Sequence, residues 1–415
     1  FISWFNRDID SYIPEEYLAE IYGVSFSASD DYDFIGNNYE RMLNYHGAHD
    51  IGHALQSLAL VGCTSFASNL NTEDSSMIIG RNFDFYINET FAGNKIVAFI
   101  NPEKGYKFMY VTWASMIGVV SGMNENGLTV TINAANSDIP KKAAMPISLL
   151  TREILQYAGN IDEAIDIASK RQIFVSESIM VGSSVDKNVV IIEKSPATQA
   201  VYTTNTNNLV CSNHFQSDVF RKEFNDQSQN DESVSEYRKL RCEQLINEKP
   251  KLYYEDVAEI LRDYKGLDDE NIGTGNEKTM AQMISHHSII FLPEKLNAWV
   301  STFPFQLGDY LSYNLKQVLN EAPYIQTNTI LYDSVLNIPS SPFLTSSDYQ
   351  KFDEFRKLRK KIKNHIREKK QLKNEEEIIE KFISSNPEYY QGWILAGDYY
   401  STHNNNQKAL MYYKK

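Results

Sequence analysis

The stretch from Val61 to Phe85 constrains the fold of this chain more than any other segment, because it has the pattern of a β-hairpin. We expect a first strand over Thr64–Leu70, a polar turn over Asn71–Ser76 and a returning strand over Met77–Phe83. The strands of a hairpin are antiparallel, so the end of the second lies beside the start of the first. The pattern therefore predicts that residues near positions 63 and 84 meet at one end of the hairpin.

Three chemically reactive residues gather at that end. Arg81 and Asp84 return beside Cys63, which directly follows Gly62. A guanidinium lowers the pKa of a neighbouring thiol and increases the fraction of thiolate. A carboxylate at the same end can hold an amine. These are the parts of an N-terminal nucleophile site.

The motif Cys-Thr-Ser-Phe-Ala, followed by Gly-Arg-Asn-Phe-Asp, resembles the opening of the choloylglycine hydrolase and penicillin V acylase family. It is also similar to the autoproteolytic acyltransferases typified by isopenicillin N acyltransferase. All are N-terminal nucleophile (Ntn) hydrolases, and the resemblance covers about Val61–Gly308. The 62 residues before Cys63 favour the acyltransferase branch, which has the longer pro-segment. The implied fold is α+β, a four-layer αββα sandwich of two antiparallel sheets between helix layers, here with a C-terminal helical extension.

The resemblance also implies site residues later in the chain. The segment Gly122–Leu128 is similar to the family's turn before a strand that ends in a site asparagine. Carried across, that asparagine is Asn133, and Asn136 is its rival because the spacing here differs slightly.

The strand that ends in Ser-Asn-His implies Asn213 as the main donor to the oxyanion, while His214 is expected to line the substrate or to be structural. The helix around Ser235–Cys242 resembles the family's arginine-containing helix. Its arginine maps onto Arg238, with Arg241 as the alternative.

The implied chemistry begins with self-cleavage between Gly62 and Cys63. The Cys63 thiol attacks the Gly62 carbonyl, and the resulting thioester is hydrolysed. The freed α-amine, whose pKa is near 8, then serves as the base for the thiol. In this interpretation Arg81 supports the thiolate and Asp84 orients the amine. A small acyl amide or thioester is the expected substrate, water and an amine both stay open as acceptor, and no cofactor is implied.

Two other classes of protein remain as alternatives. One is a catalytically inactive Ntn-fold binding protein with a tetratricopeptide-like interaction segment. The other is a zinc enzyme using His46, His49 and His53, which are spaced by three and four residues in a helix expected over about Tyr39–Leu60. No carboxylate base follows in the HExxH manner, so we expect these histidines to pack a pro-segment helix that covers the acyl pocket, with no metal.

The middle of the chain alternates strand and helix patterns. Strands are expected within 95–132 and 178–204 and in a final hairpin over 286–302, and helices over 146–171 and 254–264. The polar segment 216–234 is expected to be a mobile loop.

The composition changes near the C-terminus. Asn337–Ser347 is rich in Pro and Ser, and Lys351–Asn374 has 11 Lys or Arg against 3 Asp or Glu. An amphipathic basic helix that docks its apolar stripe, or that contacts a protein or an anionic membrane surface, is expected there. The last 40 residues resemble one tetratricopeptide unit. The expected domains are a pro-segment (1–62), a catalytic domain (63–336), a linker (337–350) and a helical segment (351–415).

Charge and composition limit the classes of partner and the environment that we expect for this chain. The net charge of −14 argues against nucleic acid, and no run of 18 apolar residues predicts a membrane helix. Cys211 and Cys242 are expected to be buried free thiols, with a disulfide as the alternative. Because the sequence starts at Phe1, we expect a removed targeting segment and an exported protein, periplasmic or surface-associated, with a cytoplasmic location as the alternative. The sequence predicts no oligomeric state.

Overall fold

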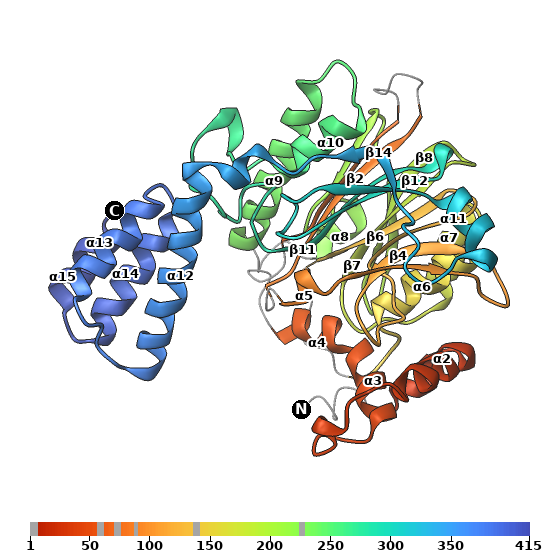
Figure 1. Cartoon of the computed structure of the whole chain (residues 1–415), viewed down its shortest axis with the longest axis horizontal. Coiled ribbons are helices and arrows are strands. Elements are labelled where there is room, and N and C mark those ends of the chain that lie inside the picture. Colours follow the sequence, from red (N-terminus) through yellow and green to blue (C-terminus); the bar gives the residue numbers. More distant parts are fainter. Residues whose placement is uncertain (1–6, 56–61, 70–75, 87–89, 136–141, 224–228) are drawn as a thin grey trace.

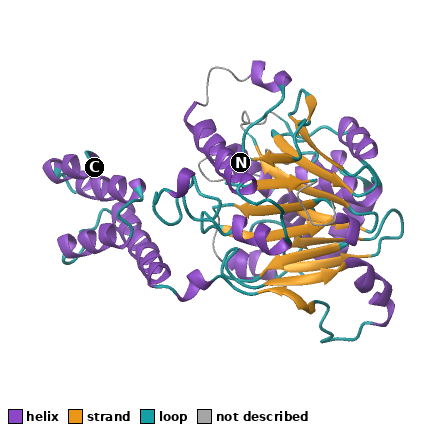
Figure 2. Cartoon of the chain, turned by 90° about the horizontal axis from the view of Figure 1, so that it is seen from above, coloured by secondary structure: helices purple, strands orange, loops and turns teal. Residues whose placement is uncertain are grey.

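The computed structural model describes residues 7–55, 62–69, 76–86, 90–135, 142–223 and 229–415 (Figure 1). Two antiparallel sheets, each of seven strands within these residues, form the centre of the molecule. Viewed from above, the strands lie among helices, and a group of helices extends away from them towards the C-terminus (Figure 2).

The first sheet carries the predicted hairpin. Its strands, in spatial order, are β10 (Asn208–Cys211), β1 (Thr64–Ser68), β2 (Ile78–Asp84), β11 (Ser285–Leu292), β12 (Asn297–Ser301), β13 (Tyr310–Asn314) and β14 (Asp333–Ile338). The strands of the hairpin are each shorter or shifted by one or two residues relative to the prediction, and most of its turn lies outside the described residues.

The second sheet is a meander in which every strand pairs with its sequence neighbour. Its strands are β3 (Ile96–Ile100), β4 (Phe108–Thr112), β5 (Ser121–Asn124), β6 (Leu128–Ala134), β7 (Glu177–Ser183), β8 (Asn188–Lys194) and β9 (Gln199–Tyr202). An uninterrupted apolar run such as that of β8 is typical of a buried central strand, but β8 is second from the edge. The run is apolar because both faces are covered: Val189 and Ile191 face the first sheet, whereas Val190 and Ile192 face the helices.

Helices cover the outer face of each sheet. On the second sheet lie α6 (Ile147–Tyr157) and α7 (Ile161–Lys170), which are the two helices predicted over 146–171. On the first sheet lie α9 (Gln229–Asn247) and α10 (Tyr254–Leu261). The order helix, sheet, sheet, helix is the four-layer αββα sandwich that the sequence predicted. Cys211 lies between the sheets and Cys242 on the buried side of α9, and both are free thiols.

Several boundaries differ from the sequence-based expectation. The segment expected to be a mobile loop contains α8 (Asp218–Glu223) and the start of α9, with 224–228 outside the described residues. The hairpin β11–β12 does not end its sheet, because β13 and β14 follow. The boundary expected at 336 therefore falls inside β14. The expected linker is also packed: Phe343 lies in a short 3-10 helix and stacks on Tyr264, with ring centroids 4.5 Å apart.

The N-terminal segment lies against the second sheet. It contains α2 (Glu15–Ser25), α3 (Asn38–His46) and α4 (Ala48–Leu55), and short helices occur elsewhere as α5 (Thr90–Gly93) and α11 (Leu315–Glu321). The single helix expected over Tyr39–Leu60 is wrong, because the chain turns at Gly47 and residues 56–60 are not described. Ile9, Tyr17 and Ile21 pack into the core under α6.

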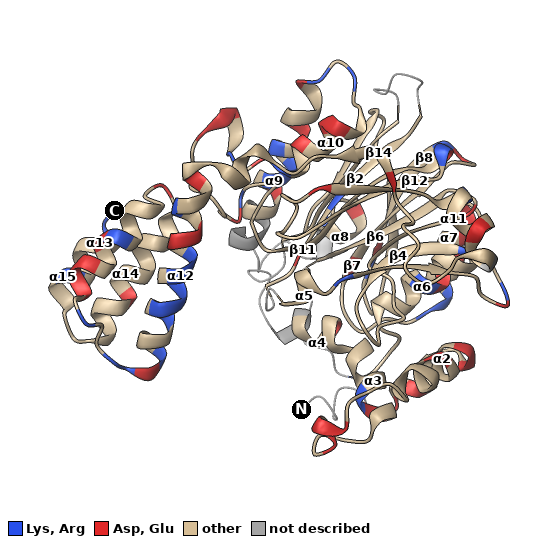
Figure 3. Ribbon diagram, viewed as in Figure 1, with Lys and Arg blue, Asp and Glu red and all other residues tan. Residues whose placement is uncertain are grey.

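The C-terminal extension is a helical unit whose core continues into the catalytic domain through Met283, Phe305 and Leu307. It consists of α12 (Ser347–Glu368), α13 (Glu375–Ser385), α14 (Tyr390–Thr402) and α15 (Asn406–Tyr413). The apolar stripe of α12 faces this core through Phe352, Phe355 and Ile362, while Lys and Arg residues line its other side (Figure 3). The pair α14–α15 is the helix-turn-helix expected from the tetratricopeptide resemblance. None of the described helices is long and apolar enough to cross a bilayer.

The extension also bonds to a loop of the catalytic domain. The Asn386 side chain accepts a hydrogen bond from Thr274 N at 3.1 Å and donates one to Thr274 O at 2.9 Å. A Cβ added to Gly273, which has a φ of +88°, would lie 2.6 Å from Tyr389, so this contact requires glycine. The tetratricopeptide-like unit thus packs on the catalytic domain.

We expect Phe355→Ala to destabilise the helical extension by about 3–5 kcal/mol, because Phe355 is buried and stacks on Phe382 with ring centroids 4.6 Å apart. Denaturant unfolding of the full chain measures the loss. Ile394→Ala, at an exposed position of α14, is the control and should change the free energy of unfolding by less than about 1 kcal/mol. Equal losses in both variants would contradict the packing described here.

Candidate active site

The pairing of β1 with β2 fixes the position of Cys63. Thr64 lies opposite Asn82 and Ser65 opposite Arg81, so Cys63, one residue before β1, lies beside the end of β2. Its side chain is buried, with 1% of its surface exposed. The structure therefore brings Cys63, Arg81 and Asp84 together as the sequence predicted.

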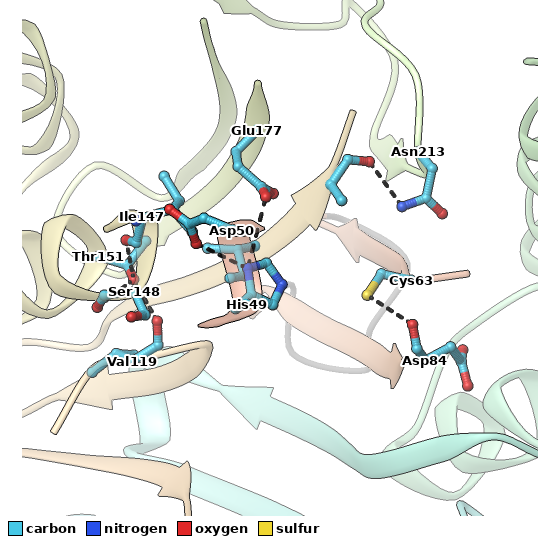
Figure 4. A network of polar contacts seen from close by, with 12 residues as sticks. His49, Asp50, Cys63, Asp84, Val119, Ile147, Ser148, Thr151, Glu177 and Asn213 are labelled. Atoms are coloured by element: carbon cyan, nitrogen blue, oxygen red, sulfur yellow. Dashed lines mark hydrogen bonds and ion pairs between the residues drawn. The ribbon is translucent and has the colours of Figure 1, made fainter. Parts of the chain in front are cut away.

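The Cys63 thiol lies between a main-chain oxygen and a guanidinium. Its Sγ donates to Asp84 O at 3.6 Å, as Figure 4 shows, and Arg81 Nη2 donates to Sγ at 3.6 Å. The guanidinium is fixed in turn by the carbonyls of Val120, at 2.9 Å, and Ile132, at 2.5 Å, and it lies 4.4 Å from the centre of the Phe83 ring. Arg81 is therefore rigidly aimed at the thiol by both sheets.

Burial of the site shifts the pKa values of its acidic groups. Burial raises the pKa of the Cys63 thiol, and the positive charge of Arg81 offsets this only in part, while the Asp84 carboxylate adds to the rise. The expectation of a lowered thiol pKa is therefore wrong for the uncut chain. Burial also raises the pKa of Asp84 to about 7, against the hydrogen bond from Ser285 and the charges of Arg238 and Arg81.

Asp84 has an unused acceptor. Its Oδ1 accepts a hydrogen bond from the Ser285 hydroxyl, but its Oδ2 is buried and has no hydrogen-bond partner among the described residues. A buried carboxylate oxygen without a donor costs free energy. The main-chain oxygen of the same residue accepts from Gly62 N at 3.1 Å, so the carboxyl group belongs to a residue in contact with the Gly62–Cys63 junction.

Two asparagine side chains lie where the sheets meet the site. Asn133 Nδ2 donates to Cys211 O at 3.0 Å, and its Oδ1 accepts from Ser65 Oγ at 2.6 Å. Asn213 Nδ2 donates to Ala134 O at 2.8 Å (Figure 4). An amide nitrogen carries two N–H donors. One N–H of each of these side chains therefore has a described main-chain acceptor. The rival Asn136 lies outside the described residues.

The structure separates the two candidate arginines of α9. Arg238 Nη2 donates to Asn213 Oδ1 at 2.6 Å and Nε donates to Thr64 Oγ1 at 3.3 Å, so it joins the site. Burial lowers its pKa to about 10, although the charges of Asp84 and Cys63 oppose that change. Arg241 instead forms ion pairs with Asp263, at 2.9 Å, and Asp269, at 2.8 Å.

The histidines that suggested zinc have other partners. His46 Nδ1 contacts Met42 O at 2.8 Å, and Nε2 accepts from Ile117 N at 3.0 Å, so both of its ring nitrogens are used. The side chain of His53 lies outside the described residues, among which no group of His, Cys, Asp and Glu could hold a metal. His214 is held by Ser235, at 2.8 Å, and Glu236, at 2.9 Å, which gives it a structural role.

His49 covers the aromatic wall of the site. Its ring stacks on that of Phe83, with centroids 6.1 Å apart, and lies tilted against that of Phe85, with centroids 5.5 Å apart. Its Nδ1 lies 3.1 Å from Asp50 Oδ1 and 3.9 Å from Glu177 Oε1 (Figure 4). Burial lowers the pKa of His49, but these two carboxylates outweigh it and raise the pKa above its ordinary value.

Sequence reasoning missed the residues that reach the site from the start of β11 and from the segment just before it. Ser285 bonds to Asp84, and Gln282 Nε2 donates to Gly62 O at 2.6 Å. The sequence named His286 and His287 only as the start of a strand; their Nε2 atoms contact Phe85 O at 2.6 Å and Ser121 Oγ at 2.9 Å. No local pattern marks these positions, because only the pairing of β11 with β2 places them here.

One protein family matches more than half of this chain. The sequence model described as "Acyl-coenzyme A:6-aminopenicillanic acid acyl-transferase" matches residues 70–302. An uncharacterized protein of Archaeoglobus fulgidus is 26% identical over 202 residues, which are 45% of this chain and 33% of that protein. The N-acylethanolamine-hydrolyzing acid amidase of Caenorhabditis elegans is 26% identical over 217 residues, 49% of this chain and 58% of the relative. The chain thus matches between a third and three fifths of these relatives' lengths.

Two solved structures are also similar. The Caenorhabditis elegans N-acylethanolamine-hydrolyzing acid amidase ortholog has a TM-score of 0.41 at 18% identity, covering 56% of this chain and 93% of that one. A variant of conjugated bile acid hydrolase from Clostridium perfringens has a TM-score of 0.41 at 12% identity, covering 61% and 93%.

The raised pKa of Asp84 predicts a pH-dependent effect of Asp84→Asn on the uncut chain, tested in a Cys63→Ala background. With a folded pKa of about 7 against an ordinary value of 3.8, the folded chain keeps a proton that the unfolded chain releases. Stability contributed by this group therefore falls as the pH rises from 4 to 7. Asparagine does not titrate and avoids that loss. The free energy of unfolding of the variant, relative to its parent, should therefore rise by up to about 4 kcal/mol between pH 4 and pH 8.

Urea unfolding at pH 4 and pH 8 measures this gain. Asp333→Asn, at an exposed position of β14, is the control and should show no such trend. A difference between Asp84→Asn and its parent that stays constant with pH would contradict the burial of a titrating carboxyl group.

Proposed function

Because the chain belongs to the acyl-coenzyme A:6-aminopenicillanic acid acyl-transferase family of Ntn hydrolases, we propose that it is a self-cleaving cysteine enzyme acting on linear amides. Cys63 is the nucleophile, and the cut falls between Gly62 and Cys63. One observation carries the proposal: a buried thiol, in contact with a fixed guanidinium, directly follows a glycine and adjoins a carboxyl group with an unused oxygen.

The first stage is the self-cleavage. The thiol loses its proton and Sγ attacks the Gly62 carbonyl carbon, after which the C–N bond breaks and the nitrogen takes up a proton. Water hydrolyses the resulting thioester, which releases a carboxylate at Gly62 and an α-amine at Cys63. Asp84 Oδ2, which has no partner among the described residues of the uncut chain, then has an ammonium group to bind. The cut thus supplies the donor that this oxygen lacks.

The second stage is turnover. The Cys63 α-amine, with an ordinary pKa near 8, takes the thiol proton, and the thiolate attacks the acyl carbon of the substrate. Arg81 stabilises the thiolate, and the second N–H donors of Asn133 and Asn213 stabilise the oxyanion, with Arg238 holding Asn213 in place. The amine leaves with a proton from the α-ammonium, and an acceptor then removes the acyl group from Sγ.

An apolar acyl group suits this site. Phe83, Phe85, Phe91 and Trp113 form a cluster of ring contacts next to the thiol, and α4 covers it through His49. We propose that α4 occupies the acyl pocket before cleavage and moves afterwards, because a substrate could not otherwise reach these rings.

Water and an amine both fit as the acceptor. The C. elegans relative is named for hydrolysis of N-acylethanolamines and the family for acyl transfer to an amine. Hydrolysis is the proposal here, and the ratio of free acid to new amide in the presence of an added amine tests it. Release of acid alone supports a hydrolase, whereas transfer in excess of hydrolysis overturns that choice.

A catalytically inactive binding protein remains the second candidate. It would keep the αββα fold and bind through the basic face of α12 or the tetratricopeptide-like unit. The enzyme is favoured because the thiol, guanidinium, carboxyl group and both asparagines are all present, and the thiol contacts both Arg81 and Asp84.

Purified protein should yield a fragment that begins Cys-Thr-Ser-Phe-Ala-Ser, whereas Cys63→Ala should remain one chain. The reason is that no other group replaces Sγ as the nucleophile. Intact mass and N-terminal sequencing decide the matter. If Cys63→Ala is still cut at this bond, a separate protease makes the cut and the mechanism is wrong.

In the cleaved protein, Asn213→Ala should lower kcat/KM for an acyl amide by about 10²- to 10³-fold, because one oxyanion donor is lost. Asn207→Ala, at an exposed position just before β10 and at the other end of that strand, is the control and should keep the parent value. Turnover of Asn213→Ala within a few-fold of the parent would remove Asn213 from the oxyanion site.

A further inference from the structure

The scissile carbonyl of Gly62 already has its own hydrogen-bond donor. Gln282 Nε2 donates to Gly62 O at 2.6 Å, and the Gln282 side chain is buried, with 5% of its surface exposed. We propose that Gln282 is a catalytic residue of the self-cleavage step, where it stabilises the oxyanion that forms on Gly62. This inference rests on the proposed self-cleavage and adds a donor for it that is distinct from the asparagines.

The identity of residue 62 supports this assignment. A Cβ placed on Gly62 would lie 2.1 Å from Gln282 Oε1 and 2.3 Å from Nε2. Any side chain at position 62 would therefore push the glutamine amide off the carbonyl. Because Gly62 has no side chain, the Gln282 amide can lie directly against the carbonyl of the Gly62–Cys63 bond.

The backbone on both sides of Gln282 is constrained. Asn82 Nδ2 donates to Met280 O at 2.9 Å and Ala281 N donates to Asp263 O at 2.7 Å, so the preceding backbone is fixed. The next residue, Met283, has a φ of 57°, a left-handed conformation that a long side chain rarely adopts. Backbone strain of this kind persists only where the surroundings impose it. The glutamine amide is thus preorganised.

The chemistry needs a donor at this atom. As the Sγ–C bond forms, the π electrons of the Gly62 carbonyl move to its oxygen, which gains a full negative charge. The Gln282 N–H strengthens its hydrogen bond to that charge, and the electrons return when the C–N bond breaks to leave the thioester and the Cys63 amine. Among the described contacts, Asn133 and Asn213 donate to Cys211 O and Ala134 O instead of Gly62 O. Self-cleavage and turnover therefore use different oxyanion donors.

The rate of self-cleavage of the full chain tests the proposal. Gln282→Met keeps the length and volume of the side chain but removes the donor, and it should slow the cut by about 10²- to 10³-fold. Gln156→Met is the matched control, because Gln156 is also buried and donates to a main-chain oxygen, Lys104 O at 2.9 Å, away from Cys63. It should be cut at the parent rate.

A second variant separates donation from packing. Gln282→Glu has the shape of glutamine and donates only when its carboxyl group is protonated, so it should be cut faster than Gln282→Met, and increasingly so at acidic pH. Cleavage of Gln282→Met within a few-fold of the parent overturns the proposal. So does a Gln282→Glu chain that is never faster than Gln282→Met, or a Gln156→Met chain that is equally slow.

Cleavage of the parent, Cys63→Ala and Gln282→Met chains also distinguishes a failure of this inference from a failure of the proposed function. A parent chain that is not cut, or a Cys63→Ala chain that is, overturns the self-cleavage itself. If the parent is cut, Cys63→Ala is not, and Gln282→Met matches the parent, only the role of Gln282 is wrong. Gly62→Ala gives an independent check: it should slow the parent strongly, but it should add little to Gln282→Ala, in which the clashing amide is already gone.

Discussion

The register between β1 and β2 is the constraint on which the site depends. With Ser65 opposite Arg81, the Arg81 side chain points between the two sheets, where carbonyls of the second sheet hold it against the thiol. Asn82 points the other way, to the helix layer, and fixes the segment that carries Gln282. Side chains alternate along a strand, so a slip of one residue would exchange these two directions and lose both functions.

The groups that this register brings together are buried, and burial changes their acidity. Burial raises the pKa values of Cys63 and Asp84, so both groups favour their protonated forms more strongly than they do in water. The proposed self-cleavage would place an amine next to the carboxyl group, where it could bind the Asp84 oxygen that has no described partner. A buried carboxyl group such as that of Asp84 lowers the stability of the folded chain. Active sites commonly contain destabilising groups of this kind.

The helical extension contacts the same network through one loop. Glu277 accepts a hydrogen bond from Arg238 through its main-chain oxygen at 2.8 Å, and its carboxylate accepts from the hydroxyls of Tyr389, at 3.2 Å, and Tyr390. Arg238 in turn holds Asn213. Contacts from the C-terminal helices therefore reach, through Glu277, the arginine that bonds to Asn213.

The sequence by itself determined the local features of this protein. The apolar periods and turn residues predicted the β1–β2 hairpin, α6, α7 and the helix pair α14–α15, and the Gly-Cys junction with Arg81 and Asp84 predicted the reactive end, because strand pairing across a short turn is a local property. Arg238 and Arg241 look alike on one helix, and only the packing of α9 shows that the first reaches Asn213 and the second Asp263. Gln282 lies 220 residues from Gly62 and belongs to no motif. Its role was decided by tertiary structure alone, since a hydrogen bond between segments so far apart exists only after β11 has paired with β2.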